Sequence, residues 1–354
     1  MITLIYFILM LGIIVFIHEL GHFLWAKKFG VYCYEFSLGF GPKLFSFKRK
    51  NDETKYSLRL IPLGGYVSMA GEEIDDDKSV PKDKKLYNKP WYKKIIIVLA
   101  GVTNNFILAF VILFFIALIN GSYTTKPVIG QVVKNSACYD AGLKSGDKIL
   151  KINDKKMYSW DDVTLHLALT TQLNKKGKPG YQKFVILDKS GKEKIISVKP
   201  KKIKTDEGES YYSYGIGLSD KKYHGIKNAF SYALSKFRSI FSSMILTIKY
   251  LIRGKIGLNS LSGPVGIYSV VGQYRQSGFS NILYLLAYLS INVGFINLLP
   301  FPAFDGYRGF IIIIEKISGK KVDPKVDAIV NNIGLILLFA LMIFITIKDI
   351  KGLF

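Results

Sequence analysis

Cysteine, histidine and acidic residues are all scarce in this 354-residue sequence. Its two cysteines, Cys33 and Cys138, are too few for a disulfide framework, which excludes a small disulfide-stapled secreted scaffold. Asp and Glu number only 26 against 49 Lys and Arg, so the net charge is +23. There are four histidines, so two of them at a metal-binding spacing form a specific signal.

Hydrophobic residues nevertheless make up 49% of the chain, and the mean hydropathy is +0.24. High positive charge with positive hydropathy is typical of a membrane protein with basic loops, not of a cytosolic enzyme or a disordered basic tail. Basic charge can also attract nucleic acid, but no helix-turn-helix, zinc-finger or RNA-binding signature is present. We therefore expect the lipid bilayer as a partner and no nucleic acid.

Four apolar segments are long enough to cross a bilayer. No basic residue precedes the first one, so we expect a retained span and not a cleaved signal peptide. The loop after it carries 15 Lys and Arg, whereas the first 26 residues carry none. The positive-inside rule therefore predicts that this loop is cytoplasmic and that both termini are extracytoplasmic. The predicted spans are residues 2–25, 95–119, 282–299 and about 330–347.

These spans divide the chain into four predicted regions. Residues 1–122 and 281–354 form membrane cores, and residues 123–220 form an extracytoplasmic domain whose short alternating runs predict strands. Residues 221–280 contain an amphipathic helix. Its apolar stripe could lie on the membrane surface or pack on the protein, and the sequence leaves both alternatives open.

The first span ends in the pentapeptide HELGH. His18 and His22 are one helical turn apart on the same face, so their imidazoles can bind one Zn²⁺. Glu19, between them, can accept a proton from water that the metal activates. Lys27 follows closely, which predicts a site inside the bilayer near its cytoplasmic side. The alternative is a set of hydrogen bonds within a helix bundle, but ionisable groups at this depth usually serve function.

A third ligand must come from elsewhere, because catalytic zinc has three protein ligands. The third span ends in NLLPFPAFDG, where Pro300 and Pro302 break the helix. Broken helices persist in membranes where they line a cavity, and Asp305 would then be a carboxylate ligand at a similar depth. The alternative is that the prolines only end the span and that Asp305 caps the next helix.

With both motifs in their spans, the sequence resembles the site-2 protease family of intramembrane zinc metalloproteases. The nearest type is the bacterial regulator-of-sigma-E protease with a single PDZ domain. The chain departs from the family at Val102, where proline is usual, and at Tyr307, where a second glycine is common. Further segments extend the resemblance over nearly the whole chain: GFGP (39–42), PLGGYV (62–67), AGVTNNF (100–106), SGPVGI (262–267) and EKISGKKV (315–322).

The resemblance implies a zinc metalloendopeptidase that cleaves transmembrane segments of single-span membrane proteins. Anti-sigma-factor-like regulators and remnant signal peptides are the implied substrates, and a multi-pass location in the cell membrane is the implied setting. It implies zinc as the cofactor, Glu19 as the general base, and three zinc ligands, namely His18, His22 and Asp305.

The resemblance also implies how substrate is held. Asn297 would hold the substrate backbone beside the helix break at Pro300 and Pro302. Residues 57–62 and 66–69 are predicted to form two strands around Gly64 and Gly65. The resemblance implies that this is a membrane-associated β-hairpin on the cytoplasmic side, which pairs with the unwound substrate by strand addition; the alternative is an ordinary cytoplasmic hairpin.

Residues 141–154 resemble the GL-xx-GD-x-I…N pattern of bacterial PDZ domains. Backbone N–H groups of this loop could capture a C-terminal carboxylate. The domain could instead act as a size filter for substrates already trimmed outside, and the sequence does not choose between these roles. The loop residues concerned are Gly142, Leu143, Gly146 and Asp147.

The expected fold is thus an α-helical polytopic membrane protein with about four transmembrane helices, the third one broken. An extracytoplasmic β-rich PDZ domain is inserted in it. Two other classes fit less of the sequence. An ion-binding transporter would have inverted repeats, which are not seen, and an inactive PDZ-bearing scaffold would lack part of the catalytic set. The oligomeric state cannot be read from the sequence.

Overall fold

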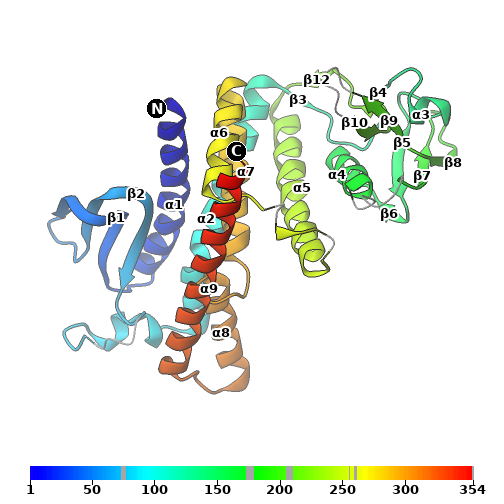
Figure 1. The fold of residues 1–354 in the computed structure, drawn as a ribbon. Coiled ribbons are helices and arrows are strands. Elements are labelled where there is room, and N and C mark those ends of the chain that lie inside the picture. The colour runs from blue at the N-terminus through cyan, green and yellow to red at the C-terminus, as the bar shows by residue number, and fades with distance from the viewer. Residues whose placement is uncertain (73–76, 173–178, 205–209, 255, 259–260, 353–354) are drawn as a thin grey trace. The chain divides into compact units, whose positions relative to one another are not determined.

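A computed structural model describes the chain in two compact units (Figure 1). One unit comprises Met1–Ile112 and Leu258–Phe354, and the other comprises Leu113–Gly257. The described residues are 1–72, 77–172, 179–204, 210–254, 256–258 and 261–352.

Four helices of the described chain are long and apolar enough to cross a membrane, as predicted. They begin and end at somewhat different residues. The fourth starts at Pro324 because the Asp323 side chain caps its N-terminus by accepting from the Lys325 N–H, 2.8 Å away. The four helices are α1 (Ile2–Lys28), α2 (Trp91–Asn120), α7 (Phe279–Asn297) and α9 (Pro324–Lys351).

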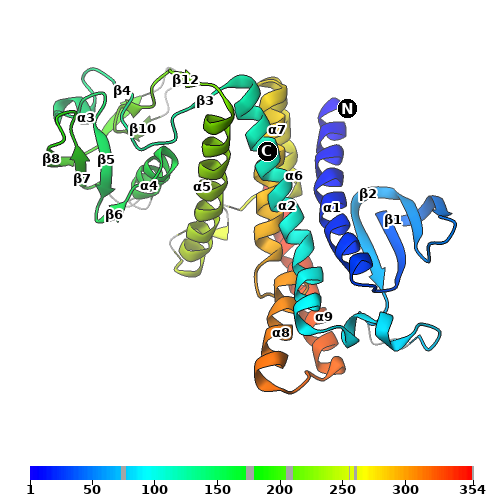
Figure 2. The same ribbon diagram turned by 180° about the vertical axis from the view of Figure 1, so that it is seen from behind.

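The loop after α1 forms a long β-hairpin, β1 (Cys33–Lys48) and β2 (Lys55–Met69). The predicted turn at Gly64 and Gly65 was wrong: residues 57–62 and 66–69 both belong to β2, and each segment pairs with β1 instead of with the other. Positive φ angles at Gly39 and Gly41 let β1 change direction, so its residues 35–38 and 43–48 both pair with residues 55–59 of β2. The register puts residues 33–38 between 65–69 and 55–58, which leaves 65–69 at a sheet edge. Both views show the hairpin beside α1 (Figures 1 and 2).

Short helices complete the first unit. The predicted break of the third span is present, because α7 ends at Asn297 and α8 (Asp305–Ser318) begins eight residues later.

Near the end of α9, Asp349 accepts from the N–H groups of Gly263 and Gly266, at 2.7 and 2.9 Å, and so caps α6 (Pro264–Gln276). The remaining elements are η1 (Lys82–Lys84) and η2 (Leu86–Asn88).

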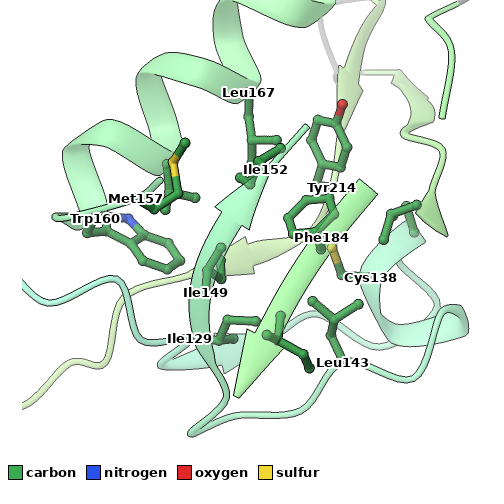
Figure 3. Close-up of a cluster of buried hydrophobic side chains, with 14 residues drawn as sticks. Ile129, Cys138, Leu143, Ile149, Ile152, Met157, Trp160, Leu167, Phe184 and Tyr214 are labelled. Atoms are coloured by element: carbon green, nitrogen blue, oxygen red, sulfur yellow. The ribbon is translucent and has the colours of Figure 1, made fainter. Parts of the chain in front are cut away.

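The second unit contains a β-rich domain with a four-stranded sheet in the order β6-β5-β7-β8. Alternate residues of β7 point into the core, and Phe184 is fully buried there. In β5 the register shifts between Ile149 and Lys151, so Ile149 and Ile152 both reach the core, which also contains Trp160 and Tyr214 (Figure 3). Its strands are β3 (Ser122–Tyr123), β4 (Gln131–Val132), β5 (Lys148–Ile152), β6 (Lys155–Lys156), β7 (Gln182–Leu187), β8 (Glu193–Val198), β9 (Lys201–Lys204), β10 (Ser210–Ser213), β11 (Ile216–Gly217) and β12 (Lys222–Tyr223).

Among its described residues this unit contains the last turns of α2 and three whole helices, α3 (Ala137–Asp140), α4 (Trp160–Gln172) and α5 (Ile226–Ile252). The predicted amphipathic helix is α5. Lys236 of α5 forms an ion pair with Asp161 of α4 at 2.6 Å, and Ala229 and Ala233 are buried, so one face of α5 packs on the protein. Phe230 and other large apolar side chains on α5 are exposed.

His166 of α4 makes the stability of this domain sensitive to acid. The side chain is 9% exposed, and burial lowers its pKa to about 4 from an ordinary 6.5. The unfolded chain therefore binds the proton first, so stability is present above pH 6.5 and is lost as pH falls toward 4, by at most about 1.4 kcal/mol per pH unit. We expect the protection factors of the β7 amides, which correct for the pH dependence of intrinsic exchange, to fall over this range. The same experiment on His166→Leu should show a weaker pH dependence, and equal dependence would contradict the assignment.

Candidate metal centre

Glycines bring α1 and α2 close together around the HELGH motif. A Cβ on Gly21 would lie 2.4 Å from the Ala100 carbonyl oxygen of α2, so only glycine allows this approach. Across the interface, a Cβ on Gly101 would lie 2.3 Å from His22 Nε2 and 2.8 Å from His18 Nε2. The backbone of α2 at Gly101 is therefore one wall of the space that the two imidazoles face.

The helix break carries Asp305 to the same place. Ala303, in the connecting loop, has a positive φ of 77°, and its N–H donates to Asn331 Oδ1 of α9 at 3.1 Å. Gly334 of α9 lies against Pro302, where a Cβ would be 2.4 Å from the proline ring. Both contacts hold the loop against α9, and α8 then begins at Asp305 with its carboxylate directed at the histidines.

Three side-chain atoms form a nearly equilateral triangle at this point. Asp305 Oδ2 lies 3.1 Å from His18 Nε2 and 3.3 Å from His22 Nε2, and the two nitrogens are 3.2 Å apart. Ligands bound tetrahedrally to Zn²⁺ at about 2.0–2.1 Å would be separated by about 3.3 Å. Two imidazole nitrogens and a carboxylate oxygen are also a donor set that suits zinc. Size and chemistry of the triangle thus fit this ion.

The outer nitrogens of both histidines face α2. His22 Nδ1 lies 2.8 Å from the Ile97 carbonyl oxygen, to which it donates when it carries the proton. His18 Nδ1 lies 3.3 Å from the carboxamide of Asn105. Both rings are buried, with 8% of each residue exposed. Helix α2 therefore orients the two rings from behind while their Nε2 atoms point at the centre of the triangle.

A cavity of about 990 Å³ opens against this triangle. Glu19 lies on its wall, and Gly65 of the edge segment of β2 is its neighbour, since a Cβ there would be 3.3 Å from Glu19 Cγ. The remaining wall comes from β2 and the turn after it, from η2 and α2, and from α8, α9 and the loops beside α8. Its polar members include Tyr66, Glu72, Lys94, Arg308, Glu315, Asn331 and Asn332.

The other predicted substrate residues lie outside this wall. Asn297 is half-buried at the end of α7, and neither it nor Pro300, Pro302 or Gly64 lines the cavity among the described residues. Two wall residues that the sequence analysis missed, Arg308 and Glu72, form an ion pair. Arg308 could have been predicted, because it lies one helical turn after Asp305 on the same face of α8.

The predicted PDZ loop uses its N–H groups inside its own domain. Leu143 N–H donates to the Cys138 carbonyl at 3.0 Å, and Gly146 N–H donates to the Ile129 carbonyl at 2.7 Å. Asp147 accepts from the Lys144 N–H at 2.8 Å, while Gly142 provides the positive φ of 84° that the turn needs. This turn therefore stabilises the domain core in the described conformation, and Leu143 is part of that core.

Comparison with known proteins places the whole chain in one family. The model of peptidase family M50 matches residues 6–341. The regulator of sigma-W protease RasP of Bacillus subtilis is 32% identical over a 429-residue alignment that covers 99% of each chain. The zinc metalloprotease RasP of Bacillus licheniformis is 31% identical with the same coverage. A protein of Fusobacterium nucleatum is 37% identical over 350 residues, 98% of each chain.

Proposed function

Because the chain belongs to peptidase family M50, the site-2 family of zinc metalloproteases, we propose that it cleaves its substrates within their transmembrane segments. The observation that carries this proposal is the triangle of His18, His22 and Asp305, two corners of which lie on the membrane-spanning helix α1. A peptide bond can reach these atoms only at that depth. The adjacent cavity supplies the polar surroundings that water and ionised groups require inside a bilayer.

We propose His18, His22 and Asp305 as the zinc ligands, with Nε2, Nε2 and Oδ2 as the donor atoms. Bound zinc supplies a Lewis acid that polarises the peptide carbonyl and lowers the pKa of water. Glu19 is the general base: its carboxylate accepts the proton of the attacking water and then donates it to the leaving amine nitrogen. Glu19 suits this role because it lines the cavity without being a corner of the triangle.

Substrate is held as an extended strand in this proposal. Residues 65–69 of β2 pair with β1 on one side only, as far as the structure describes the chain, and Tyr66, Val67 and Met69 of this edge line the cavity. An unwound peptide can add to the edge through backbone hydrogen bonds, with its scissile bond near Glu19. Gly65 keeps this approach open because any side chain there would crowd Glu19. For Asn297 to hold substrate as well, the segment between α7 and α8 has to move.

We propose an orientation with both termini and the β-rich domain outside the cell membrane and with the catalytic site near the cytoplasmic side. The basic loop after α1 supports it, as do Lys27 and Lys28 in the last turn of α1. The β-hairpin has an exposed apolar end, where Leu44 and Phe45 are each 61% exposed, and this suits contact with lipid.

For residues 123–220 we propose a PDZ domain. Peptide capture there would use β11, which pairs with β4 on one edge, because most N–H groups of the turn at 142–147 donate within the domain. The size-filter role requires no free N–H group. Binding of C-terminal peptides to the full-length protein separates the two, since only the capture role predicts saturable binding that depends on the peptide carboxylate.

Single-span regulators of sigma factors are the substrates that the name of the Bacillus subtilis relative favours for this chain. The test uses purified full-length protein and a model single-span substrate in detergent. We expect cleavage that a zinc chelator abolishes and added zinc restores, with the cut mapped by mass spectrometry inside the apolar segment. A cut confined to the extramembrane parts of the substrate would contradict the proposal.

A further inference from the structure

Asn105 is a fully buried polar residue directly behind the metal centre. It lies on α2 with 0% exposure, and its carboxamide is 3.3 Å from His18 Nδ1. When Nδ2 is the atom directed at His18, Oδ1 is left without a hydrogen-bond partner in the described part of the chain. A buried polar atom without a partner is costly whichever end of the carboxamide occupies that position, so this cost does not choose between the two ends. The two ends of a carboxamide have nearly the same shape, so chemistry has to decide which one faces the ring.

Metal binding by His18 decides which end of the Asn105 carboxamide faces the ring, and this inference rests on the proposed zinc site. The triangle uses His18 Nε2, which must offer a lone pair to the ion, so the single proton of the neutral ring is on Nδ1. An Nδ1–H group is a donor and requires an acceptor. Of the two ends of the Asn105 carboxamide, only Oδ1 accepts.

We propose that Asn105 is a positioning residue for the metal centre: its Oδ1 accepts the Nδ1–H of His18 and thereby holds the ring in its metal-binding tautomer and orientation. The arrangement around His22 is the same, with the Ile97 carbonyl as the acceptor at 2.8 Å. Such partners raise the basicity of a ligating imidazole and fix its direction. His18 alone depends on a side chain for this contact, so its support can be removed by substitution.

Neighbouring contacts hold Asn105 in place. Ser290 of α7 donates its hydroxyl to the Asn105 backbone carbonyl at 2.9 Å, and Ser290 is itself fully buried. Asn104, the adjacent residue, has a different contact, because its Nδ2 donates to the Ile17 carbonyl at 3.3 Å. The chain thus offers two consecutive asparagines on one helix, of which only Asn105 contacts a proposed ligand.

The test measures zinc affinity of the purified full-length protein by competition with a chelator. We expect Asn105→Leu, which keeps the size but lacks the acceptor, to bind zinc about 10–100-fold more weakly. Asn105→Asp restores an acceptor and should bind within about threefold of wild type, because carboxylate–histidine–zinc contacts are equally effective. Asn104→Leu is the matched control and should leave the affinity unchanged. The visible absorption of the Co²⁺-loaded protein should change for Asn105→Leu and return for Asn105→Asp.

Thermal melting of the chelated proteins separates folding from metal binding, because metal then contributes nothing to stability. Wild-type affinity in Asn105→Leu would overturn the inference, and so would an equal loss in Asn105→Leu and Asn105→Asp, since packing alone would explain it. Either outcome leaves the proposed protease function standing. Failure of the wild-type protein to bind zinc would instead overturn the proposed function, and the inference with it.

Discussion

Replacing Glu19 by Gln is expected to lower the rate of substrate cleavage by about 10²–10⁴-fold while zinc remains bound at full stoichiometry. The amide has nearly the same shape as the carboxylate but cannot accept the proton of the attacking water. Glu19 lines the cavity beside the triangle and is not one of its corners, so ligand geometry should survive the change. Initial rates on a single-span substrate and zinc content of the same preparation measure both parts.

Glu72→Gln is the matched control, because Glu72 lines the same cavity and Gln still offers an acceptor to Arg308. Loss of one ion pair is worth at most about 1 kcal/mol at a partly exposed site, so we expect less than a tenfold change in rate. A Glu19→Gln protein that keeps more than a tenth of the wild-type rate would show that another group is the base. A Glu19→Gln protein without zinc would show that Glu19 helps to hold the ion.

The second large effect is expected at Gly101, which carries no functional group. A methyl group there would lie 2.3 Å from His22 Nε2, well inside van der Waals contact, and 2.8 Å from His18 Nε2. Both imidazoles would have to move, although His22 Nδ1 is held by the Ile97 carbonyl on the same helix. Displacement of two ligands by about 1 Å removes the geometry that zinc requires. We expect Gly101→Ala to purify without stoichiometric zinc and without proteolytic activity.

Gly309→Ala is a suitable control for Gly101→Ala. Gly309 is also buried in a helix, but a Cβ there would meet only Leu99 Cδ2 at 3.5 Å, an ordinary contact. Alanine should be tolerated at this position and should favour the helix by up to about 1 kcal/mol. Zinc content measured by atomic absorption distinguishes the two variants. Full zinc occupancy in Gly101→Ala would contradict the close approach of α2 to the metal centre.

Local regularities in the sequence were sufficient for much of the fold. All four membrane helices could be predicted because a lipid-facing helix needs about 20 apolar residues in one run. Strands β5, β7 and β8 lie in the region 123–220 that was predicted to be rich in strands from its short alternating runs. Helix α4 and strands β9 and β10 were missed. Every residue of strand β9 is exposed, so its sequence shows no alternation of apolar and polar residues that could have predicted a strand.

Some residues of the candidate site could likewise be predicted from the sequence, and others could not. His18, Glu19 and His22 lie within five consecutive residues of one helix, so helical geometry alone brings them together. Two prolines mark the helix break after which Asp305 follows. Glu72 and Arg308 are separated by more than two hundred residues, and no local pattern relates them. The roles of Asn105 and Gly101 likewise depend on how closely α1 and α2 approach.

The sequence by itself determined the membrane-spanning class and the histidine pair with its neighbouring glutamate, because these depend on composition or on spacing within one helix. The protease activity followed from the resemblance of its motifs to a known family. Tertiary structure alone decided which edge of the hairpin lies beside Glu19, that Asn297 lies outside the cavity wall, and which groups of α2 support the two histidines. These features arise where separate segments pack against each other. Such packing depends on distances between atoms of different segments, such as those at Gly21 and Gly101. The spacing of residues along the chain does not predict these distances.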